Sequence, residues 1–406
     1  MIARLYSPLL QEMLQLFPVV AVVGPRQVGK STLVSLLSDR EYLSLDDITL
    51  RSTAEGDAKA FLDRTQPITV DEVQLVPGLL REIKRLSDLN RQPGRFLLTG
   101  SADLDHCADI SHVLAGRVGV MRLPPITRAE ETGATRWMDW LTSSSAESLD
   151  AAFTSHKSPP FDFSRLLRGG FPLSVRARTA RERSLWMESF RLTYLERDLR
   201  RISDIGNLAD FNRLMLLTAG LTATIVNQAS LARDAGLSPA TAGRHLSILE
   251  ASLLIRRIPP YFINIGKRLV KSPKLFWTDT GLCSHLLGIA DIKIIDSEPL
   301  LRGRLFESFV MMEVESLLSL LPTPARLHHV RTHDQLEVDG LIDCGRTKLL
   351  FEVKASRTVT AEDAASMEQW IALNPTHGPG IVIYSGTDYQ PLTKNVRAIP
   401  ASMLFG

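Results

Sequence analysis

The sequence predicts an α/β protein of several domains, and three kinds of periodicity predict it. Apolar strands alternate with helices near the N-terminus, which is typical of a parallel sheet with helices on both faces. A helical pattern follows, and two strands with period-two alternation stand near the C-terminus. The expected parts are a parallel-sheet domain at 1–128, a linker or surface loop at 129–164, a helical lid at 165–225, a winged helix-turn-helix at 226–290 and a mixed α/β domain at 291–406.

The first domain contains the glycine-rich sequence GPRQVGKS between the apolar strand 19–23 and a helix that begins near Ser31. Strand, glycine loop and helix is the context in which such a loop binds the phosphates of a nucleoside triphosphate. Inward-turned backbone N–H groups contact phosphate, Lys30 reaches the β- and γ-phosphates, and Ser31 ligates Mg²⁺. The expected ligands are therefore ATP and Mg²⁺. The expected binding residues are Gly24, Pro25, Arg26, Gln27, Val28, Gly29, Lys30, Ser31 and Thr32.

A second apolar strand ends in Asp71 and Glu72. We expect Asp71 to hold Mg²⁺, directly or through water. We expect Glu72 to orient and deprotonate an attacking water, which favours hydrolysis over a kinase reaction. A further strand, 95–101, ends in hydroxyl side chains at the edge where ligands bind to parallel sheets. Thr99 or Ser101 is thus a candidate γ-phosphate sensor, with a plain turn as the alternative.

Arg117 lies just before a fifth expected strand, 118–123. It is a candidate for stabilising charge in the transition state, either in cis or in a neighbouring subunit. A surface arginine without a catalytic role is the alternative.

With these motifs the chain resembles the AAA-type P-loop ATPases, and more narrowly the bacterial and archaeal ATPases that carry a C-terminal domain of unknown function, family 4143. The resemblance implies ATP binding and implies little about the cellular role. It extends over most of the chain and rests on the loop at 24–31, LDD at 45–47, VDEVQ at 70–74, LTGS at 98–101, LAGR at 114–117, GGFP at 169–172, YLERD at 194–198 and FEVK at 351–354.

The helical segment is rich in arginine, and acidic residues lie nearby. We favour a salt-bridged lid over a phosphate-binding stripe for this segment. The arginines concerned are Arg191, Arg197, Arg200 and Arg201.

A helix-turn-helix pattern follows, with a first helix at 227–235 and a turn at Gly236. Ser238 is expected to cap the second helix and Pro239 to occupy its first position. Strands at 254–258 and 274–277 would form the wing. Because such modules also pack against proteins, DNA and a protein partner both stay open. The residues placed where a recognition helix touches base edges are Thr241, Arg244 and His245.

The strands 335–343 and 348–354 are separated by four residues, a common hairpin length. If Asp343 pairs with Lys348, Asp339 stands opposite Glu352 with Cβ atoms about 5 Å apart. Two opposed carboxylates repel each other unless a cation lies between them. In this register one apolar face combines Leu336, Val338, Ile342, Leu349, Phe351 and Val353.

With Lys354, these two carboxylates resemble the site of the PD-(D/E)xK nucleases. The resemblance implies Mg²⁺ held by Asp339 and Glu352, with Lys354 in the catalytic set. Glu307, on a preceding helix, matches the extra acidic position of that fold and is by this resemblance a further expected Mg²⁺ ligand. Gln369 is a further candidate match. The alternatives are a simple Glu337–Lys354 ion pair and a nuclease-like fold that binds DNA or protein without cutting. The histidines 328, 329 and 333 are expected in an exposed turn.

Composition sets broad limits on function. Hydrophobic residues make up 44% of the chain and the formal net charge is +2, so charge alone does not demand nucleic acid. The three cysteines are scattered, which favours neither a disulfide framework nor a zinc ribbon. The longest apolar run, 214–226, is shorter than the about 20 residues of a membrane-spanning helix. With no apolar signal core at the start, a cytoplasmic protein without a membrane partner is expected.

We therefore expect Mg²⁺-dependent ATP hydrolysis coupled to nucleic-acid binding or processing, with DNA as the partner and cleavage by the C-terminal domain left open. The alternative is a regulatory or signalling NTPase whose C-terminal parts bind a protein partner and cut nothing. A homo-oligomer is compatible with both.

Overall fold

The computed structural model describes residues 2–101, 110, 112–198, 207–261, 272–331, 336–374 and 378–406. The chain divides into two compact units, which are described separately. The first holds Met1–Pro125, Thr193–Gly206 and Leu246–Leu254, and the second holds Ile126–Leu192, Asn207–His245 and Ile255–Gly406. Within the described ranges, every helix is too short or too polar to span a bilayer.

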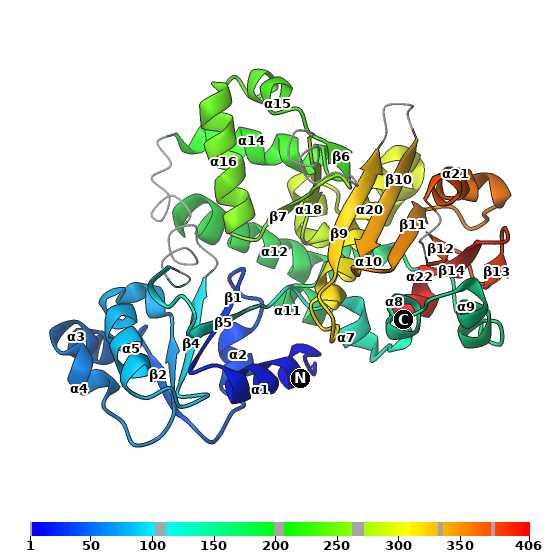
Figure 1. Ribbon diagram of the computed structural model, residues 1–406. Coiled ribbons are helices and arrows are strands. Elements are labelled where there is room, and N and C mark those ends of the chain that lie inside the picture. Colours follow the sequence, from blue (N-terminus) through cyan, green and yellow to red (C-terminus); the bar gives the residue numbers. More distant parts are fainter. Residues whose placement is uncertain are drawn as a thin grey trace. The chain divides into compact units, whose positions relative to one another are not determined.

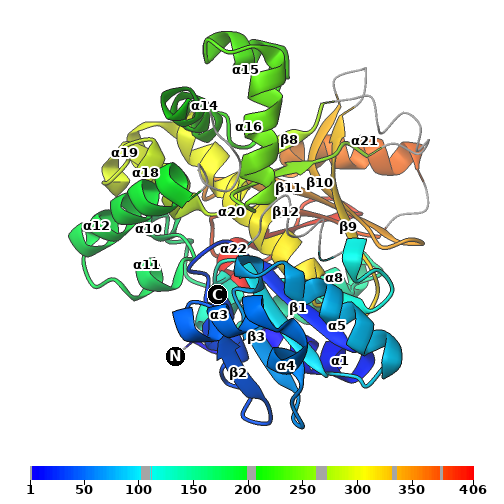
Figure 2. The same ribbon diagram turned by 90° about the vertical axis from the view of Figure 1, so that its left-hand side faces the viewer.

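The first unit is built on a five-stranded parallel sheet with the strand order β2-β3-β4-β1-β5, whose strands are labelled between Figure 1 and Figure 2. This confirms the parallel α/β sheet expected for the N-terminal region. The strands are β1 (Val19–Gly24), β2 (Glu41–Ser44), β3 (Ile68–Asp71), β4 (Phe96–Ser101) and β5 (Val118–Arg122).

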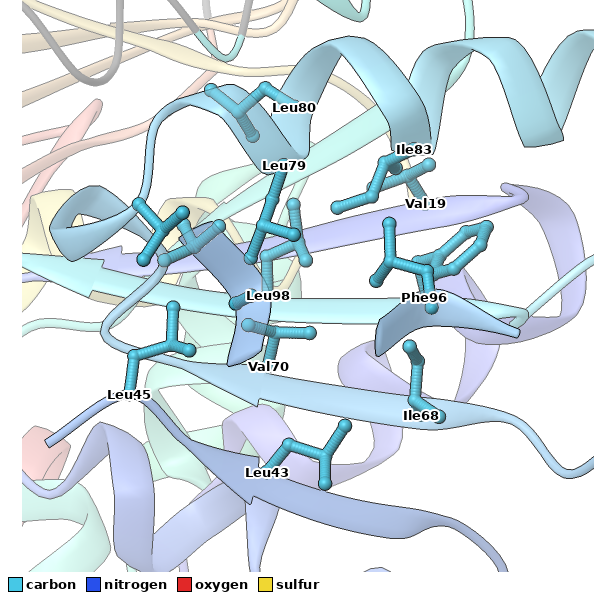
Figure 3. Close-up of a cluster of buried hydrophobic side chains, with 14 of the residues drawn as sticks. Val19, Leu43, Leu45, Ile68, Val70, Leu79, Leu80, Ile83, Phe96 and Leu98 are labelled. Atoms are coloured by element: carbon cyan, nitrogen blue, oxygen red, sulfur yellow. The ribbon is translucent and has the colours of Figure 1, made fainter. Parts of the chain in front are cut away.

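One face of this sheet packs against helices that follow β2 and β3. Figure 3 shows Leu79, Leu80 and Ile83 of α5 beside alternate residues of the strands, such as Val70 and Leu98. These alternate residues form one buried apolar cluster, as a period-two strand pattern requires. The helices of this unit are α1 (Tyr6–Leu16), α2 (Lys30–Val34), α3 (Ile48–Gly56), α4 (Ala58–Leu62), α5 (Gly78–Leu89) and the short 3-10 helix η1 (Val73–Leu75).

The middle of the chain is helical, as its sequence pattern predicts. Arg191 forms an ion pair with Glu188 at 2.6 Å, in agreement with a salt-bridged segment. The side chains of Arg197, Arg200 and Arg201 lie outside the described part of the chain. The helical elements are α10 (Ser164–Arg168), α11 (Pro172–Arg176), α12 (Ala180–Phe190), the π-helix η2 (Arg191–Asp198), α14 (Leu208–Gly220), α18 (Thr280–Leu286) and α19 (Ile292–Ser297).

The predicted helix-turn-helix pair is present as α15 (Gln228–Asp234) and α16 (Pro239–Ala251). The Ser238 hydroxyl accepts the Thr241 N–H at 3.1 Å, which confirms the predicted cap. A small sheet of order β6-β8-β7 accompanies the pair. Its strands are β6 (Thr224–Ile225), β7 (Ile255–Ile258) and β8 (Lys274–Trp277).

His245 corrects one expectation for α16. It was placed among the base-contacting residues, but its side chain is 1% exposed and its ring lies edge-on to Phe211. Burial lowers the pKa of His245, which favours the neutral ring. The helix therefore turns this residue inward, while Arg244 stays exposed.

The C-terminal region forms a mixed six-stranded sheet of order β13-β14-β12-β11-β10-β9. β10 and β11 pair antiparallel with Asp343 opposite Lys348, so the predicted register is confirmed. The elements are α20 (Pro299–Leu318), β9 (Arg326–Arg331), β10 (Glu337–Asp343), β11 (Lys348–Lys354), η3 (Ala361–Ala364), α21 (Ala365–Leu373), β12 (Gly380–Tyr384), β13 (Gln390–Pro391), β14 (Val396–Pro400) and α22 (Ala401–Phe405).

The expected division of apolar faces on this hairpin is wrong. A register shift between Val338 and Leu341 inserts one extra residue of β10 against β9. Such a bulge moves the residues before it to the other face, so Val338 shares a core with Leu341 and Leu350. The histidines also differ from expectation: His328 and His329 are buried in β9 rather than exposed in a turn, and residue 333 lies outside the described ranges.

Residues 129–164 are not the linker or surface loop that their serine content suggested. They carry most of α7 (Arg128–Thr132), α8 (Arg136–Leu141) and α9 (Ala146–Phe153) and belong to the second unit. Within the segment, Ser145 is the N-cap of α9, so this hydroxyl begins a helix instead of marking a loop; Thr127, just before the segment, caps α7 in the same way.

This segment packs on the C-terminal sheet. Trp140 is fully buried with its ring edge-on to Phe351 of β11, 5.6 Å between centroids. Asp150 forms a bidentate ion pair with Arg397 of β14, at 2.7 and 2.8 Å, and accepts the Tyr389 hydroxyl at 2.6 Å. The C-terminal domain therefore includes residues far earlier in the chain than 291.

Candidate nucleotide site and carboxylate cluster

The glycine loop follows β1 at the carboxyl edge of the sheet. A Cβ atom on Gly24 would lie 2.4 Å from the Leu123 carbonyl oxygen, so only glycine fits there. Gln27 and Gly29 have left-handed backbones, with φ of 62° and 96°. Alternating handedness of this kind turns successive N–H groups toward one side and makes a concavity for anions. Val28 is buried and anchors the loop.

Lys30 begins α2 and turns back over the loop. Its ammonium donates to the carbonyl oxygens of Gly24 and Pro25, at 3.0 and 2.9 Å. The side chain is 5% exposed, and burial lowers its pKa to about 8, although the Glu72 and Asp71 carboxylates act in the opposite direction. A buried lysine beside a glycine loop of this conformation is suited to bind a polyanion, whose charge would favour the ammonium form.

Asp71 is the centre of the site. The Ser31 hydroxyl donates to its Oδ1 at 3.0 Å and the Thr99 hydroxyl donates to the same oxygen, while the Tyr42 hydroxyl donates to Oδ2 at 2.6 Å. The alternation of side chains along the strands explains why these groups lie close to Asp71. Tyr42, Asp71 and Thr99 lie on the sheet face opposite the apolar cluster, and α2 brings Ser31 to the same place.

Glu72 follows Asp71 in a left-handed conformation, with φ of 57°, that a side chain rarely adopts. Its N–H donates to Thr99 Oγ1 at 3.2 Å, and the Gln74 amide donates to its carboxylate. Burial raises the pKa of Glu72, while the Lys30 ammonium acts to lower it. The carboxyl group is thus oriented by backbone and side chain together.

Three residues of this site were not identified as functional from sequence. Tyr42 gave no signal beyond alternation in β2, and Gln74 stood only in the family motif. Arg4 donates to the Val28 carbonyl at 2.9 Å and to Pro124 at 2.7 Å, so it ties the loop to the end of β5. Arg26, an expected nucleotide contact, has its guanidinium 5.6 Å from the centroid of the Tyr194 ring.

Arg117 does not lie at the site. Its carbonyl accepts the N–H of Val19, the first residue of β1, and its guanidinium pairs with Asp88 at 2.5 Å. The glycine loop follows the other end of β1, about 17 Å away at 3.3 Å per residue. The expectation that Arg117 acts at the nucleotide site of its own chain is therefore wrong, because the residue lies at the opposite end of β1. Thr32 is exposed on α2, and the side chain of Ser101 lies outside the described part.

The predicted C-terminal residues do come together. Asp339 Oδ2 accepts the Val353 N–H at 3.0 Å, and the Asp339 N–H donates to Glu352 at 3.3 Å. Lys354 pairs with Glu352 at 3.1 Å rather than with Glu337. Gln369 is exposed on α21 and does not join them, because that helix buries its other face.

Lys274 of β8, which sequence reasoning missed, also enters this cluster. Its Nζ lies 2.5 Å from Glu307 Oε1, 3.1 Å from Asp339 Oδ1 and 3.7 Å from Glu337 Oε1. The fit to Mg²⁺ is therefore poor, since an ammonium already lies at the oxygens that would bind the ion. No group of three or more metal-type side chains is open to a metal among the described residues.

Comparison with known protein families gives separate matches for the N-terminal, middle and C-terminal parts of the chain. The family described as "AAA domain" matches residues 16–131. Two families described as domains of unknown function, DUF8612 and DUF4143, match residues 163–293 and 302–404. The uncharacterized protein Rv2008c of Mycobacterium tuberculosis is 32% identical over 394 residues, 95% of this chain and 81% of that protein. Mb2031c of Mycobacterium bovis matches to the same extent.

Among solved structures, the chain is similar to the Walker-type ATPase PABY2304 of Pyrococcus abyssi. The TM-score is 0.44 at 14% identity, and the match covers 70% of this chain and 96% of that one.

Proposed function

This chain belongs to the family of proteins that join an N-terminal AAA domain to a C-terminal DUF4143 domain, and from that premise we propose that it binds ATP with Mg²⁺ at residues 24–32 and hydrolyses it. One observation carries the proposal. Ser31 of the loop and Thr99 of β4 both donate to Asp71, one residue before Glu72, so the groups that hydrolysis needs converge.

Each residue has a distinct role in this proposal. The N–H groups around Gln27, Val28 and Gly29 bind phosphate oxygens, and Lys30 leaves the loop carbonyls to contact the β- and γ-phosphates. Ser31 and Asp71 hold Mg²⁺, which supplies charge neutralisation at the phosphates when it is bound. Thr99 fixes Asp71 and the backbone of Glu72, so it links the metal-binding and water-binding residues.

Glu72 is the proposed general base. Its left-handed backbone and its bond from Gln74 aim the carboxylate, and its position beside Asp71 places it near the phosphate-binding loop. A base must be deprotonated to act. Because burial raises the pKa of Glu72, the acid limb of the rate profile should fall at higher pH than an ordinary glutamate would give.

Glu72→Gln should lower the ATP turnover number by about 100-fold or more, since general-base catalysis contributes 10²–10⁴. ATP affinity should stay within about threefold, because the residue contacts water rather than phosphate. Steady-state turnover and nucleotide titration measure the two quantities. Glu55→Gln, an exposed residue of α3, is the matched control. Equal turnover in Glu72→Gln and the control would remove Glu72 from the mechanism.

Tyr42 is proposed to position Asp71 for the metal. Tyr42→Phe deletes the 2.6 Å hydrogen bond to Asp71 Oδ2 and keeps the ring. Loss of one such bond, about 1 kcal/mol, should raise the Mg²⁺ concentration needed for half-maximal turnover about fivefold. Nucleotide affinity without Mg²⁺ should not change. If Tyr42→Phe needs the same Mg²⁺ concentration for half-maximal turnover as wild type, Tyr42 does not position Asp71 for the metal.

Coupling of ATP turnover to nucleic acid is the second part of the proposal. It is supported by the helix-turn-helix pair, on which Arg233 and Arg244 are exposed. DNA cleavage is not proposed, because Lys274 occupies the carboxylate cluster. Steady-state ATP turnover with and without branched, nicked and single-stranded DNA tests the coupling. Stimulation severalfold by DNA supports it, and turnover that ignores DNA favours the regulatory NTPase with a protein partner.

A further inference from the structure

The carboxylates near the β10–β11 hairpin are held too closely to remain without positive charge. Glu307, Asp339 and Glu352 come from α20, β10 and β11, and each side chain is at most 15% exposed. Asp339 and Glu352 are also joined through the Asp339 N–H. In such a setting mutual repulsion and loss of hydration would be severe unless cations or protons balance the carboxylates.

Two lysines supply that balance within the second unit. Lys354 pairs with Glu352, and Lys274 lies between Glu307 and Asp339 with its side chain only 5% exposed. Three buried carboxylates and two ammonium groups leave one charge in excess. Burial, together with Asp339, raises the pKa of Glu352 to about 8, and the same two causes raise the pKa of Glu307, so a proton can balance the remaining charge.

A divalent ion and Lys274 cannot share this position. Mg²⁺ requires ligand oxygens at 2.0–2.1 Å in an octahedral arrangement, whereas the ammonium already lies 2.5 and 3.1 Å from the oxygens of Glu307 and Asp339. Strong like-charge repulsion would oppose a second cation beside it. Lys274 enters from β8, a strand of the small sheet that accompanies α15 and α16.

We propose that Lys274 is the built-in cation of this cluster, standing where a divalent metal would otherwise bind, so that the C-terminal domain is independent of metal. The ion cluster then joins β8 to α20 and to the β10–β11 hairpin by charge. This inference is separate from ATP hydrolysis and rests first on the contacts of Lys274 with Glu307 and Asp339.

Mn²⁺ binding to the full chain without nucleotide tests the proposal, with the free-ion signal followed by electron paramagnetic resonance. Wild type and Asp339→Asn should bind Mn²⁺ equally, because the cluster holds none. Lys274→Met keeps the aliphatic volume of the side chain and should gain a new Mn²⁺ site. Its affinity for Mn²⁺ should be at least tenfold higher than the limit that the wild-type titration sets for binding at the cluster. The double variant Lys274→Met, Asp339→Asn should lose this new Mn²⁺ site. Any Mn²⁺ bound at the P-loop is the same in all of these proteins, so it does not affect the comparisons.

Lys348→Met is the matched control. Lys348 also pairs with an aspartate of the same hairpin, Asp343 at 2.7 Å, but at the other end. The Lys348→Met protein should bind Mn²⁺ as wild type does. Of these two single variants, only Lys274→Met should have a higher unfolding temperature when Mn²⁺ is added. Folded Lys274→Met that acquires no Mn²⁺ site overturns the proposal. So does Asp339-dependent Mn²⁺ binding in wild type, a comparison that needs no folded Lys274 variant.

Discussion

Lys30→Ala is expected to abolish measurable ATP hydrolysis, with a loss of at least about 100-fold in the turnover number. The reason is electrostatic. A cation fixed at transferring phosphates stabilises charge in the transition state, and removal of one such donor from a buried site commonly costs 10²–10³ in rate. Lys30 is the buried cation directly beside the glycine loop, and alanine leaves the phosphates without it.

The experiment must separate catalysis from folding. Lys30 also donates to the Gly24 and Pro25 carbonyls, so alanine removes two hydrogen bonds from the loop. Thermal unfolding and circular dichroism of the variant show whether the sheet survives. Lys84→Ala, at an exposed position of α5, controls for removal of a positive charge from the same unit. Undiminished turnover in a folded Lys30→Ala protein would mean that hydrolysis occurs elsewhere in the chain.

The P-loop and the β10–β11 hairpin were predictable because each is encoded within one short stretch. At 19–36 a strand, a glycine loop and a helix follow directly, and around 344–347 a short loop fixes which residues face each other. In both places local spacing determines the geometry. Asp71 ends β3 and Glu72 follows it directly, so their position at this edge of the sheet was predictable from local sequence, while their roles remain the proposal made above.

Residues brought in by tertiary packing were not predictable in this way. Tyr42 reaches Asp71 because β2 lies beside β3, and Lys274 meets Asp339 across 65 positions of sequence. Nothing in their local patterns distinguishes them from other strand residues. His245 was misplaced for a related reason, since helix periodicity alone does not tell which face of α16 packs on Phe211.

Residues 129–164 show how a compositional signal can mislead. Serine and threonine are frequent both in loops and at helix N-caps, and here Thr127 and Ser145 are caps. The apolar residues of the segment were the better indicator, because Trp140 and Phe153 are fully buried. Pairing of Asp150 with Arg397 then connects the start of this unit to its last strands.

Trp140→Ala should therefore destabilise the C-terminal sheet by about 3–5 kcal/mol, the usual cost of deleting a large buried aromatic side chain. Trp140 is 0% exposed and packs edge-on against Phe351, so alanine leaves a cavity beside β11. Hydrogen exchange of the full-length protein measures the effect locally. Amides of β11 and β14 should lose protection, while those of β3 in the first unit serve as the internal reference.

Met138→Ala is the matched control, because Met138 lies on the same helix, α8, but is 43% exposed. It should change protection by less than about 0.5 kcal/mol, as exposed substitutions usually do. If Trp140→Ala were as mild as Met138→Ala, the segment would contribute little to the sheet, which is closer to the linker or surface loop that its serine content suggested. Strong loss of protection in β11 would instead establish that the C-terminal domain is completed by residues that precede the whole helical middle of the chain.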